Sequence, residues 1–367
     1  MDHTDITVVI STYNRCEILP AAMESVLTQD APGINYELII VDNNSTDATP
    51  QVVDSFIGRG YKNLRYVFEP LQGLSHGRNA GIKNARGAIV VFVDDDVRAR
   101  RDWLRNIKRA FDFYIEAECV GGKILPSWKS EPPAWLNSDH WGPLALQDYG
   151  ENPLCADNET PLCLAGANFA FRREVFQHAL FSPDFPRAQD IEFLLRFWLS
   201  GRRAMYVPDV VVFADVQEER LTKAYHRKWH ATNGTFNSLM RLGEFVGSNG
   251  QILASLPTAV KLFDAPGFLY RELVRESAQW FMDTVRRRES LSFKHENRVR
   301  YLIRYIRKRY EHEFAKRNSS HVLEVGRFIT AMVHKKILPD HFARQRARSI
   351  IENPTTHLSS NVETKKL

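Results

Sequence analysis

The stretch "AIVVFVDDDVRARRDWL" (residues 88–104) runs from an unbroken apolar segment directly into three consecutive aspartates, Asp94, Asp95 and Asp96. A segment that is apolar at every position is typical of a strand buried on both faces of a parallel sheet. Ligands of such sheets bind beyond the carboxyl ends of the strands, which is where the aspartates follow. Because adjacent carboxylates repel one another, this position indicates that a cation is held among them.

The sequence before this stretch alternates strand-like and helix-like segments. Apolar strand patterns occupy residues 6–12, 36–42, 64–69 and 88–94, and helical patterns occupy residues 17–29, 46–57 and 74–85. This alternation predicts a doubly wound α/β fold whose mostly parallel central sheet is flanked by helices. The residues that directly follow each strand are therefore the first candidates for a ligand site.

Polar and aromatic residues follow the first two strands. Thr12 and Tyr13 offer a hydroxyl and a ring that suit a planar base, although the same residues would also make an ordinary turn into a helix. Asp42 can accept a hydrogen bond from a base N–H or a ribose hydroxyl. The residues after it, 45–47, would serve equally as helix caps.

The turn after the third strand, "GLSHGRNAG" (73–81), combines three glycines with Arg78 and Asn79. It matches neither the GxGxxG dinucleotide pattern in a first βα unit nor the P-loop pattern GxxxxGK[ST]. It can still bring a guanidinium close to a phosphate.

Residues 94–96 allow three interpretations. A solvated surface cluster is disfavoured because the preceding strand is central. A phosphatase would carry its DxD after the first strand and have Thr or Val two positions after the second aspartate, where this sequence has Arg98. A hard divalent cation, Mg²⁺ or Mn²⁺, fits best, because such ions bind one or two carboxylates together with the phosphates of a substrate.

Six segments, taken in their order and spacing, resemble family 2 glycosyltransferases of the GT-A fold. They are "VVISTYNR" (8–15), "LIIVDNNSTD" (38–47), "GRNAGIKNARG" (77–87), "VFVDDD" (91–96), "GANFAFRREVF" (166–176) and "QDIEFLLR" (189–196). Each segment alone is common, whereas the combination is specific. The resemblance covers the first two thirds of the chain and implies an inverting enzyme that uses a nucleotide sugar.

The resemblance assigns the donor side of the site. It implies that Thr12, Tyr13 and Asp42 hold the base and the ribose, with Arg78 and Asn79 nearby. Asp94 and Asp96 would be the outer members of the DxD motif, through which Mn²⁺ or Mg²⁺ binds the diphosphate of the sugar nucleotide. Asp95 would contact the ribose or the sugar.

The acceptor side follows from the same resemblance. Asp190 would be the base that takes the proton from the acceptor hydroxyl, unless it is only a helix N-cap. Glu192 is the alternative base, but it lies roughly 200° around the helix from Asp190, so both cannot point into one site. Trp128 and Trp135 would stack on sugar faces or pack a lid, and Asn168 would line the acceptor side.

Two positions depart from the pattern of the family. Gln189 stands where the family often has Glu before the catalytic aspartate. Ala214 stands where related enzymes often carry a His that completes the metal shell. His226 or His230 would replace that ligand, or both histidines are structural.

Charge divides the chain into two parts. Residues 1–215 hold 21 Lys and Arg against 29 Asp and Glu, a net charge of −8, and residues 216–367 hold 28 against 15, a net charge of +13. We expect a GT-A domain over residues 1–235, with a nucleotide-binding half (1–100) and an acceptor half (101–235). A helical basic extension (236–351) and a disordered tail (352–367) follow.

The basic extension shows two amphipathic patterns. The first stripe contains Tyr270, Leu273, Val274, Trp280 and Phe281, and the second contains Val299, Leu302, Ile303 and Ile306. Together with Tyr305 they suit either an anionic membrane face or packing against the rest of the protein. Nucleic acid is not an expected partner, because no nucleic-acid module accompanies the charge.

The composition is that of an ordinary globular protein, with 44% hydrophobic and 25% charged residues in a chain of 367. No apolar run reaches the roughly 18–20 residues that cross a bilayer, and no secretory signal pattern is visible. The four cysteines, Cys16, Cys119, Cys155 and Cys163, lack the close spacing of a zinc site and are expected to be reduced. We expect a cytoplasmic protein, peripheral on the inner face of the cell membrane.

These observations predict a metal-dependent glycosyltransferase that moves a sugar from a nucleotide donor, UDP-linked, to a glycan or polyprenyl-lipid-linked acceptor in cell-surface polysaccharide biosynthesis. One alternative is a nucleotide-sugar hydrolase that uses the same metal site. The other is a catalytically silent protein that binds nucleotide or carbohydrate. Gln189 and Ala214, the two departures from the family pattern, suggest this alternative.

Overall fold

The structure is a computed structural model that describes residues 4–185, 187–241, 245, 260–314 and 320–334. These residues form two compact units. The sheet unit comprises the described parts of Met1–Lys129, Ala145–Asp157 and Leu162–Val216. The helical unit comprises the described parts of Ser130–Leu144, Asn158–Pro161 and Gln217–Leu367.

The sheet unit is built on one nine-stranded sheet with the order β3-β2-β1-β4-β8-β6-β9-β5, in which β7 also pairs with β9. The strands are β1 (Ile6–Thr12), β2 (Tyr36–Asp42), β3 (Leu64–Phe68), β4 (Ile89–Val93), β5 (Val97–Ala99), β6 (Cys119–Trp128), β7 (Leu154–Ala156), β8 (Asn168–Arg172) and β9 (Ala204–Val216). The pairs β3–β2, β2–β1, β1–β4 and β6–β9 are parallel. The predicted α/β fold with a mostly parallel central sheet is confirmed.

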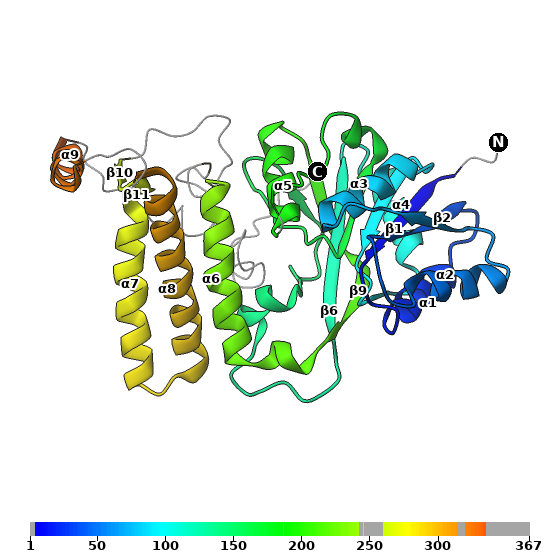
Figure 1. Ribbon diagram of the computed structural model, residues 1–367, viewed down its shortest axis with the longest axis horizontal. Helices are drawn as coiled ribbons and strands as arrows, with labels where there is room; N and C mark the ends of the chain where they lie inside the picture. The colour runs from blue at the N-terminus through cyan, green and yellow to red at the C-terminus, as the bar shows by residue number, and fades with distance from the viewer. Residues whose placement is uncertain (1–3, 186, 242–244, 246–259, 315–319, 335–367) are drawn as a thin grey trace. The chain divides into compact units, whose positions relative to one another are not determined.

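Helices connect the strands of the first half in the predicted order. They are α1 (Leu19–Leu27), α2 (Thr49–Gly58) and α3 (Leu74–Asn84), and the second half adds α4 (Trp103–Phe113) and α5 (Gln189–Leu199). Figure 1 shows α1 and α2 on one side of the strands and α3 on the other. Both faces of the sheet are therefore covered, which explains why its strands are apolar throughout.

Strand β4 occupies the predicted central position. All five of its residues are buried, and it lies between β1, to which it is parallel, and β8, to which it is antiparallel. Its last residue, Val93, pairs with Asn168 at the start of β8. The chain therefore delivers residues 94–96 to the carboxyl edge of the sheet, in the middle of its width.

A cluster of phenylalanines fills the core beside β4. Its members are Phe92, Phe169, Phe171, Phe176, Phe181, Phe193 and Phe197, with ring centroids of neighbouring members 4.6 to 6.5 Å apart. Such aromatic pairs contribute about 0.5–1.5 kcal/mol each beyond their burial. Because the cluster joins β4, β8 and α5, it fixes the end of β4 relative to the start of α5.

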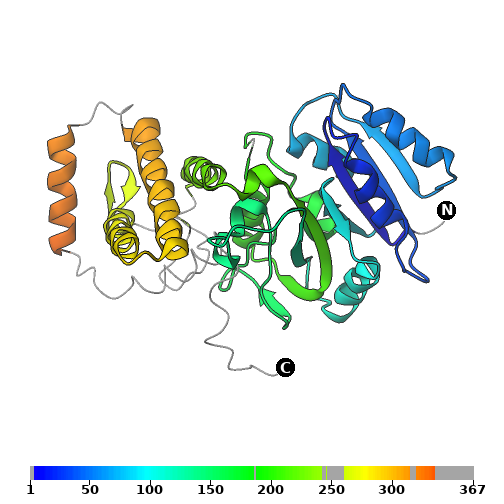
Figure 2. The same cartoon turned by 90° about the horizontal axis from the view of Figure 1, so that it is seen from below.

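The helical unit contains α6 (Lys223–Leu239), α7 (Gly267–Val285), α8 (Glu289–Arg309) and α9 (His321–His334), with a small hairpin of β10 (Lys261–Leu262) and β11 (Ala265–Pro266). Helix α8 packs against both α6 and α7, and Figures 1 and 2 show the hairpin beside the start of α7. Its apolar core consists of Phe268, Leu269, Tyr301, Leu302 and Tyr305. Among the described helices, none combines the length and the apolar character that crossing a bilayer requires.

The domain boundary differs in detail from the predicted one. The sheet unit ends at Val216, whereas the predicted boundary at 235 falls inside α6, which belongs to the helical unit. The predicted tail, 352–367, lies outside the described residues.

The structure divides the first predicted amphipathic stripe. Leu273 packs against the core of the helical unit and Trp280 is half-buried, whereas Val274 and Phe281 are 69% and 70% exposed. Tyr305 is buried in that core, so it has no surface to offer a membrane. The second stripe is mainly a core face.

A substitution in α3 tests how closely this helix lies on β1. A Cβ at Gly81 would come 2.3 Å from Cγ1 of Val9, so we expect Gly81→Ala to lower the free energy of unfolding by about 1–3 kcal/mol in urea denaturation. Gly58→Ala in α2 is the matched control, because a Cβ there meets nothing within 4 Å. It should be neutral or slightly stabilising. Equal stabilities of the two variants would contradict the close packing of α3.

Candidate active site

The carboxyl ends of β1 and β4 meet in a hydrogen bond between two predicted site residues. The hydroxyl of Thr12, the last residue of β1, donates to Oδ2 of Asp95 at 2.7 Å. Asp95 is only 6% exposed, and Thr12 is buried as well. This bond ties the turn after β4 to the end of β1.

Arg15, which was not among the predicted site residues, is the cation closest to Asp95 and Asp96. Its Nη1 donates to Oδ1 of Asp95 at 2.8 Å and to Oδ2 of Asp96 at 3.2 Å. Burial raises the pKa of Asp95, in spite of the opposing effects of Arg15 and of the Thr12 hydroxyl. The only sequence signal for Arg15 is a basic residue shortly after a strand end.

Arg78 supplies the cation for Asp94. It starts from α3, is 4% exposed, and places Nη2 3.5 Å from Oδ1 of Asp94. Its guanidinium lies over the rings of Phe169 and Phe181, 5.5 and 5.2 Å from their centroids. The other terminal nitrogen, Nη1, is buried and has no hydrogen-bond partner within the described residues. One buried donor of this guanidinium therefore remains for an anionic ligand.

The carboxylate of Asp94 is held in an unfavourable charge environment. Burial raises its pKa to about 6, Arg78 opposes this shift, and the charges of Asp96, Asp95 and Asp190 add to it. The side chain still keeps 39% of its surface exposed, so it is open to a ligand. Positive charge brought by a ligand would relieve this repulsion.

Asp190 lies in the first turn of α5. Its Oδ2 accepts a hydrogen bond from the backbone N–H of Gly166 at 3.2 Å. The N-cap of α5 is Ala188, which has a φ of 59° and no side-chain cap, so the interpretation of Asp190 as the N-cap is wrong. Gly166, whose N–H donates to Asp190, also lies against the guanidinium of Arg78, because a Cβ there would come 2.4 Å from Nη2. Asp190 thus lies near the arginine that faces Asp94, and its charge adds to the raised pKa of that carboxyl.

Glu192 points elsewhere. Both of its oxygens accept hydrogen bonds from Arg196, from Nε at 2.6 Å and from Nη2 at 2.8 Å, and the residue is buried. This ion pair along α5 leaves Asp190 as the better candidate base. The acceptor role predicted for Glu192 stays a prediction.

The other predicted donor-side residues differ in accessibility. Tyr13 is 45% exposed, as a stacking platform requires. Asp42 is buried, and its carboxylate already accepts hydrogen bonds from the Tyr66 hydroxyl and the Ser45 backbone N–H. The amide of Asn79 makes two hydrogen bonds with the backbone of Phe181 and so holds a loop. The binding roles of Asp42 and Asn79 remain predictions.

The residues predicted for the acceptor side do not share one environment. Asn168 is fully buried, and its amide bonds the Trp103 indole N–H and the carbonyls of Lys123 and Val210 within the sheet unit. Trp128 is half-buried at the end of β6. Trp135 belongs to the helical unit and is buried there, with its ring centroid 4.8 Å from that of Phe293. Asn168 and Trp135 thus have structural roles that their sequence context did not show.

The donor set suits a metal that is shared with a substrate. Asp94 and Asp96 are carboxylates on one turn, and no cluster of three or more His, Cys, Asp or Glu with metal-binding geometry occurs in the described part of the chain. Mg²⁺ and Mn²⁺ need few protein ligands when phosphate oxygens complete the shell. The residues present therefore fit a divalent cation that arrives with a diphosphate.

The two substitutes considered for the missing histidine lie in the helical unit. Burial lowers the pKa of His226 to about 4 and that of His230 to about 3, so both are neutral at physiological pH. His226 Nε2 is hydrogen-bonded to the carbonyl of Arg220 at 3.1 Å. Ala214 pairs with Val97, one residue beyond the DxD motif, so this position does face the motif along the sheet.

Comparison with known proteins identifies the family. Residues 7–180 match the family model described as Glycosyl transferase family 2. The chain carries a family 2 glycosyltransferase domain. The mannosyltransferase PcManGT from Pyrobaculum calidifontis, solved with GDP-Man and Mn²⁺, superposes with a TM-score of 0.51 at 18% identity, over 94% of this chain and 83% of that one. This likeness shows that the family 2 domain has the GT-A fold predicted for it.

Two curated relatives match shorter segments of the chain. A glucosyl-dolichyl phosphate glucuronosyltransferase of Haloferax volcanii is 26% identical over 173 residues, 47% of this chain and 53% of that protein. The minor teichoic acid biosynthesis protein GgaA of Bacillus subtilis is 32% identical over 124 residues, 33% of this chain and 27% of that protein. The chain spans about half or less of the length of these relatives.

The raised pKa of Asp94 predicts a pH-dependent effect on the stability of the ligand-free protein. Because the pKa of Asp94 in the fold, about 6, lies above the value of 3.8 for a free side chain, the stability that its proton contributes is lost as pH rises through about 6. Asp94→Asn should therefore raise the melting temperature by on the order of 2 °C at pH 8, with a smaller gain at pH 5. An equal effect at both pH values would contradict this assignment.

Proposed function

We propose that the chain is an inverting glycosyltransferase that moves a sugar from a nucleoside diphosphate donor, UDP-linked, to a glycan or polyprenyl-lipid-linked acceptor in cell-surface polysaccharide biosynthesis. The observation that carries the proposal is that Asp94 and Asp190 both lie near the guanidinium of Arg78, and that the charge of Asp190 adds to the raised pKa of Asp94. Asp94 would serve the leaving group of the donor and Asp190 the acceptor hydroxyl. The names of the glucuronosyltransferase and of the teichoic acid protein support the class of acceptor.

On the donor side, the base would stack on the exposed ring of Tyr13 and the ribose would lie along the edge formed by Thr12 and Asp95. Nη1 of Arg78, which has no hydrogen-bond partner within the described residues, would donate to a phosphate oxygen or to a sugar hydroxyl. Asp94 and Asp96 would hold a divalent cation, whose charge would stabilise the departing diphosphate. Arg15 would leave Asp96 to that cation and turn its guanidinium toward the diphosphate.

On the acceptor side, Asp190 would accept the proton of the acceptor hydroxyl as the oxygen attacks the anomeric carbon from the face opposite the diphosphate. The hydrogen bond from the Gly166 N–H fixes the orientation of the carboxylate. Gln189, next to Asp190, is buried and adds no second negative charge at this position.

We further propose that the chain acts on the cytoplasmic side of a membrane. All four cysteines are unpaired thiols, as a reducing compartment requires. Sugar nucleotides and lipid-linked acceptors meet at such a surface.

Removing the proposed base tests the chemical step. We expect Asp190→Asn to lower kcat by about 10²–10⁴ while the donor still raises the melting temperature. Glu192→Gln is the matched control, because Glu192 pairs with Arg196 and should cause no comparable loss. If Glu192→Gln abolishes transfer and Asp190→Asn does not, Glu192 rather than Asp190 is the base.

Removing one proposed metal ligand tests donor binding. A panel of sugar nucleotides with Mn²⁺ should contain one that raises the melting temperature, since a ligand at 100 times its Kd adds about 2.7 kcal/mol of stability. Asp96→Ala should abolish that shift, whereas Asp112→Ala, an exposed residue of α4, should retain it. An unchanged shift in Asp96→Ala would overturn the metal–diphosphate site, and donor turnover that no acceptor accelerates would identify a hydrolase instead.

A further inference from the structure

Helix α7 carries its acidic side chains on its buried side only. Its three carboxylates, Glu272, Glu276 and Asp283, are all buried within the helical unit. Glu272 pairs with Arg298 of α8, and the other two pair with His295, whose ring nitrogens lie 2.7 and 3.5 Å from Glu276 and Asp283. No acidic side chain therefore remains on the exposed side of α7.

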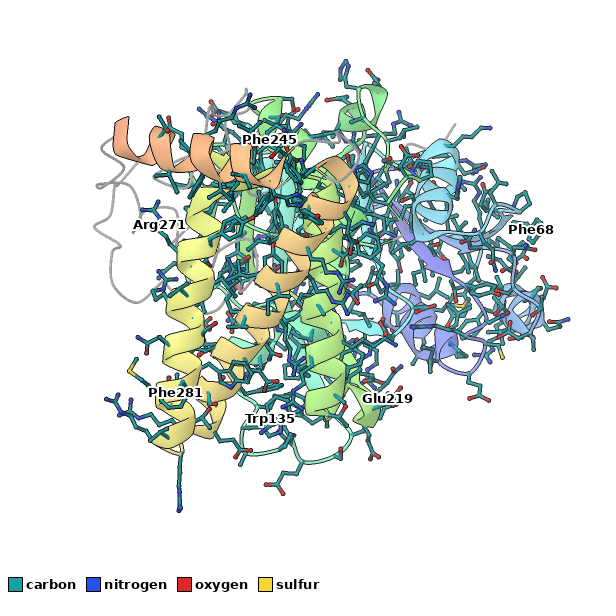
Figure 3. All side chains as sticks on the ribbon, turned by 60° about the vertical axis from the view of Figure 1, so that its left-hand side comes forward. Phe68, Trp135, Glu219, Phe245, Arg271 and Phe281 are labelled. Carbon is teal, nitrogen blue, oxygen red and sulfur yellow. The ribbon has the colours of Figure 1, made fainter. Side chains whose placement is uncertain are left out.

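The exposed side of α7 is a narrow apolar stripe. Val274, Phe281 and Val285 are 69%, 70% and 67% exposed, and Ala278 lies between them. At 100° per residue these four positions fall within an arc of roughly 60°. Figure 3 shows Phe281 and Arg271 on the outer side of α7, away from α8. We call Val274, Ala278, Phe281 and Val285 the α7 stripe.

Arginines border the α7 stripe at both ends. Arg271 is exposed at one end, and Arg286, Arg287 and Arg288 are exposed at the other, directly after Val285. Arg288 lies 3.9 Å from Asp283, whereas Arg271, Arg286 and Arg287 form no ion pair with any described residue. Leu291, at the start of α8, is 39% exposed and follows the same turn. Within the described part of the chain, this surface therefore combines large apolar side chains with three arginines that have no counter-charge.

This charge pattern argues against a second copy of the chain as the occupant. If the α7 stripes of two chains packed in parallel, the arginines at each end of one stripe would lie against the same arginines of the other chain. Packed in antiparallel fashion, Arg271 would meet the arginines that follow Val285. Both arrangements bring like charges together without a carboxylate between them. The complementary partner is an anionic surface that also accepts apolar side chains.

We propose that the α7 stripe and residues 286–288 dock on an anionic lipid bilayer. Phe281, Val285 and Leu291 would enter the boundary between headgroups and acyl chains, and the arginines would remain at the level of the phosphates. The helix would lie in the plane of the surface, because it is amphipathic rather than long and apolar. The purpose of this docking, delivery of a lipid-linked acceptor, rests on the proposed function.

The test is partition of the full chain onto vesicles of phosphatidylcholine with phosphatidylglycerol, compared with phosphatidylcholine alone. We expect binding to the anionic vesicles only, weakened at high salt. Phe281→Ser combined with Val285→Ser should lower the partition coefficient roughly tenfold, and Arg286→Gln combined with Arg287→Gln should lower it about thirtyfold. The matched control is Phe113→Ser, because Phe113 is 78% exposed on α4 of the sheet unit. It should bind like the wild type.

Each alternative result overturns the proposal. Absence of binding to anionic vesicles does so directly, and binding that survives both double variants places the membrane contact elsewhere. Concentration-dependent self-association that Phe281→Ser abolishes would make a second copy the occupant. The donor-induced melting shift, measured on the same variants without vesicles, tests the proposed function separately. If the donor still raises the melting temperature but the protein does not bind vesicles, only this inference fails. If the protein binds vesicles but no donor raises the melting temperature, only the proposed function fails.

Discussion

Three carboxylates stand next to one another at the end of β4, and the fold can hold them there because two arginines are built into the same edge of the sheet. Arg78 rests on the phenylalanine core and faces Asp94 from α3, whereas Arg15 reaches Asp95 and Asp96 from the loop after β1. Arg15 thus comes from a strand–helix connection and Arg78 from within a helix. The ion pairs that neutralise these aspartates therefore link the positions of β1, α3 and β4. The phenylalanine cluster extends this link to α5.

The compensation is incomplete. The pKa of Asp94 remains raised even with Arg78 beside it, and Nη1 of that arginine is buried without a hydrogen-bond partner among the described residues. A fully neutralised site would have little affinity for a cation and a diphosphate. Sites of this kind give up stability in the ligand-free state so that the ligand can restore it. The proposed donor would bring both kinds of charge that the site lacks.

In the helical unit, the acidic side chains of α7 are used in buried ion pairs. Its helices carry many arginines, and the fold pairs those that point inward with carboxylates, as in the contacts of Arg298 with Glu272 and of Arg227 with Glu296. This arrangement uses acidic residues in the interior and leaves the outer side of α7 without them. Arg271, Arg286 and Arg287 therefore stand beside exposed apolar side chains with no acidic neighbour on the same side of α7. That coincidence gives the surface of α7 its proposed partner.

Local sequence determined the strands of the parallel half, their order, the position of residues 94–96 at a central strand end and the family to which the domain belongs, because alternating strand and helix patterns are short-range signals. It did not determine the role of Arg15, whose carboxylate partners lie 80 and 81 residues away. Nor did it show that Trp135 is a core residue, or that α7 turns Glu272 and Glu276 inward and Phe281 outward. Periodicity ranks side chains by hydropathy alone, whereas a buried ion pair with a neighbouring helix can make an acidic face the inner one. Only the tertiary structure decides which helix supplies that partner.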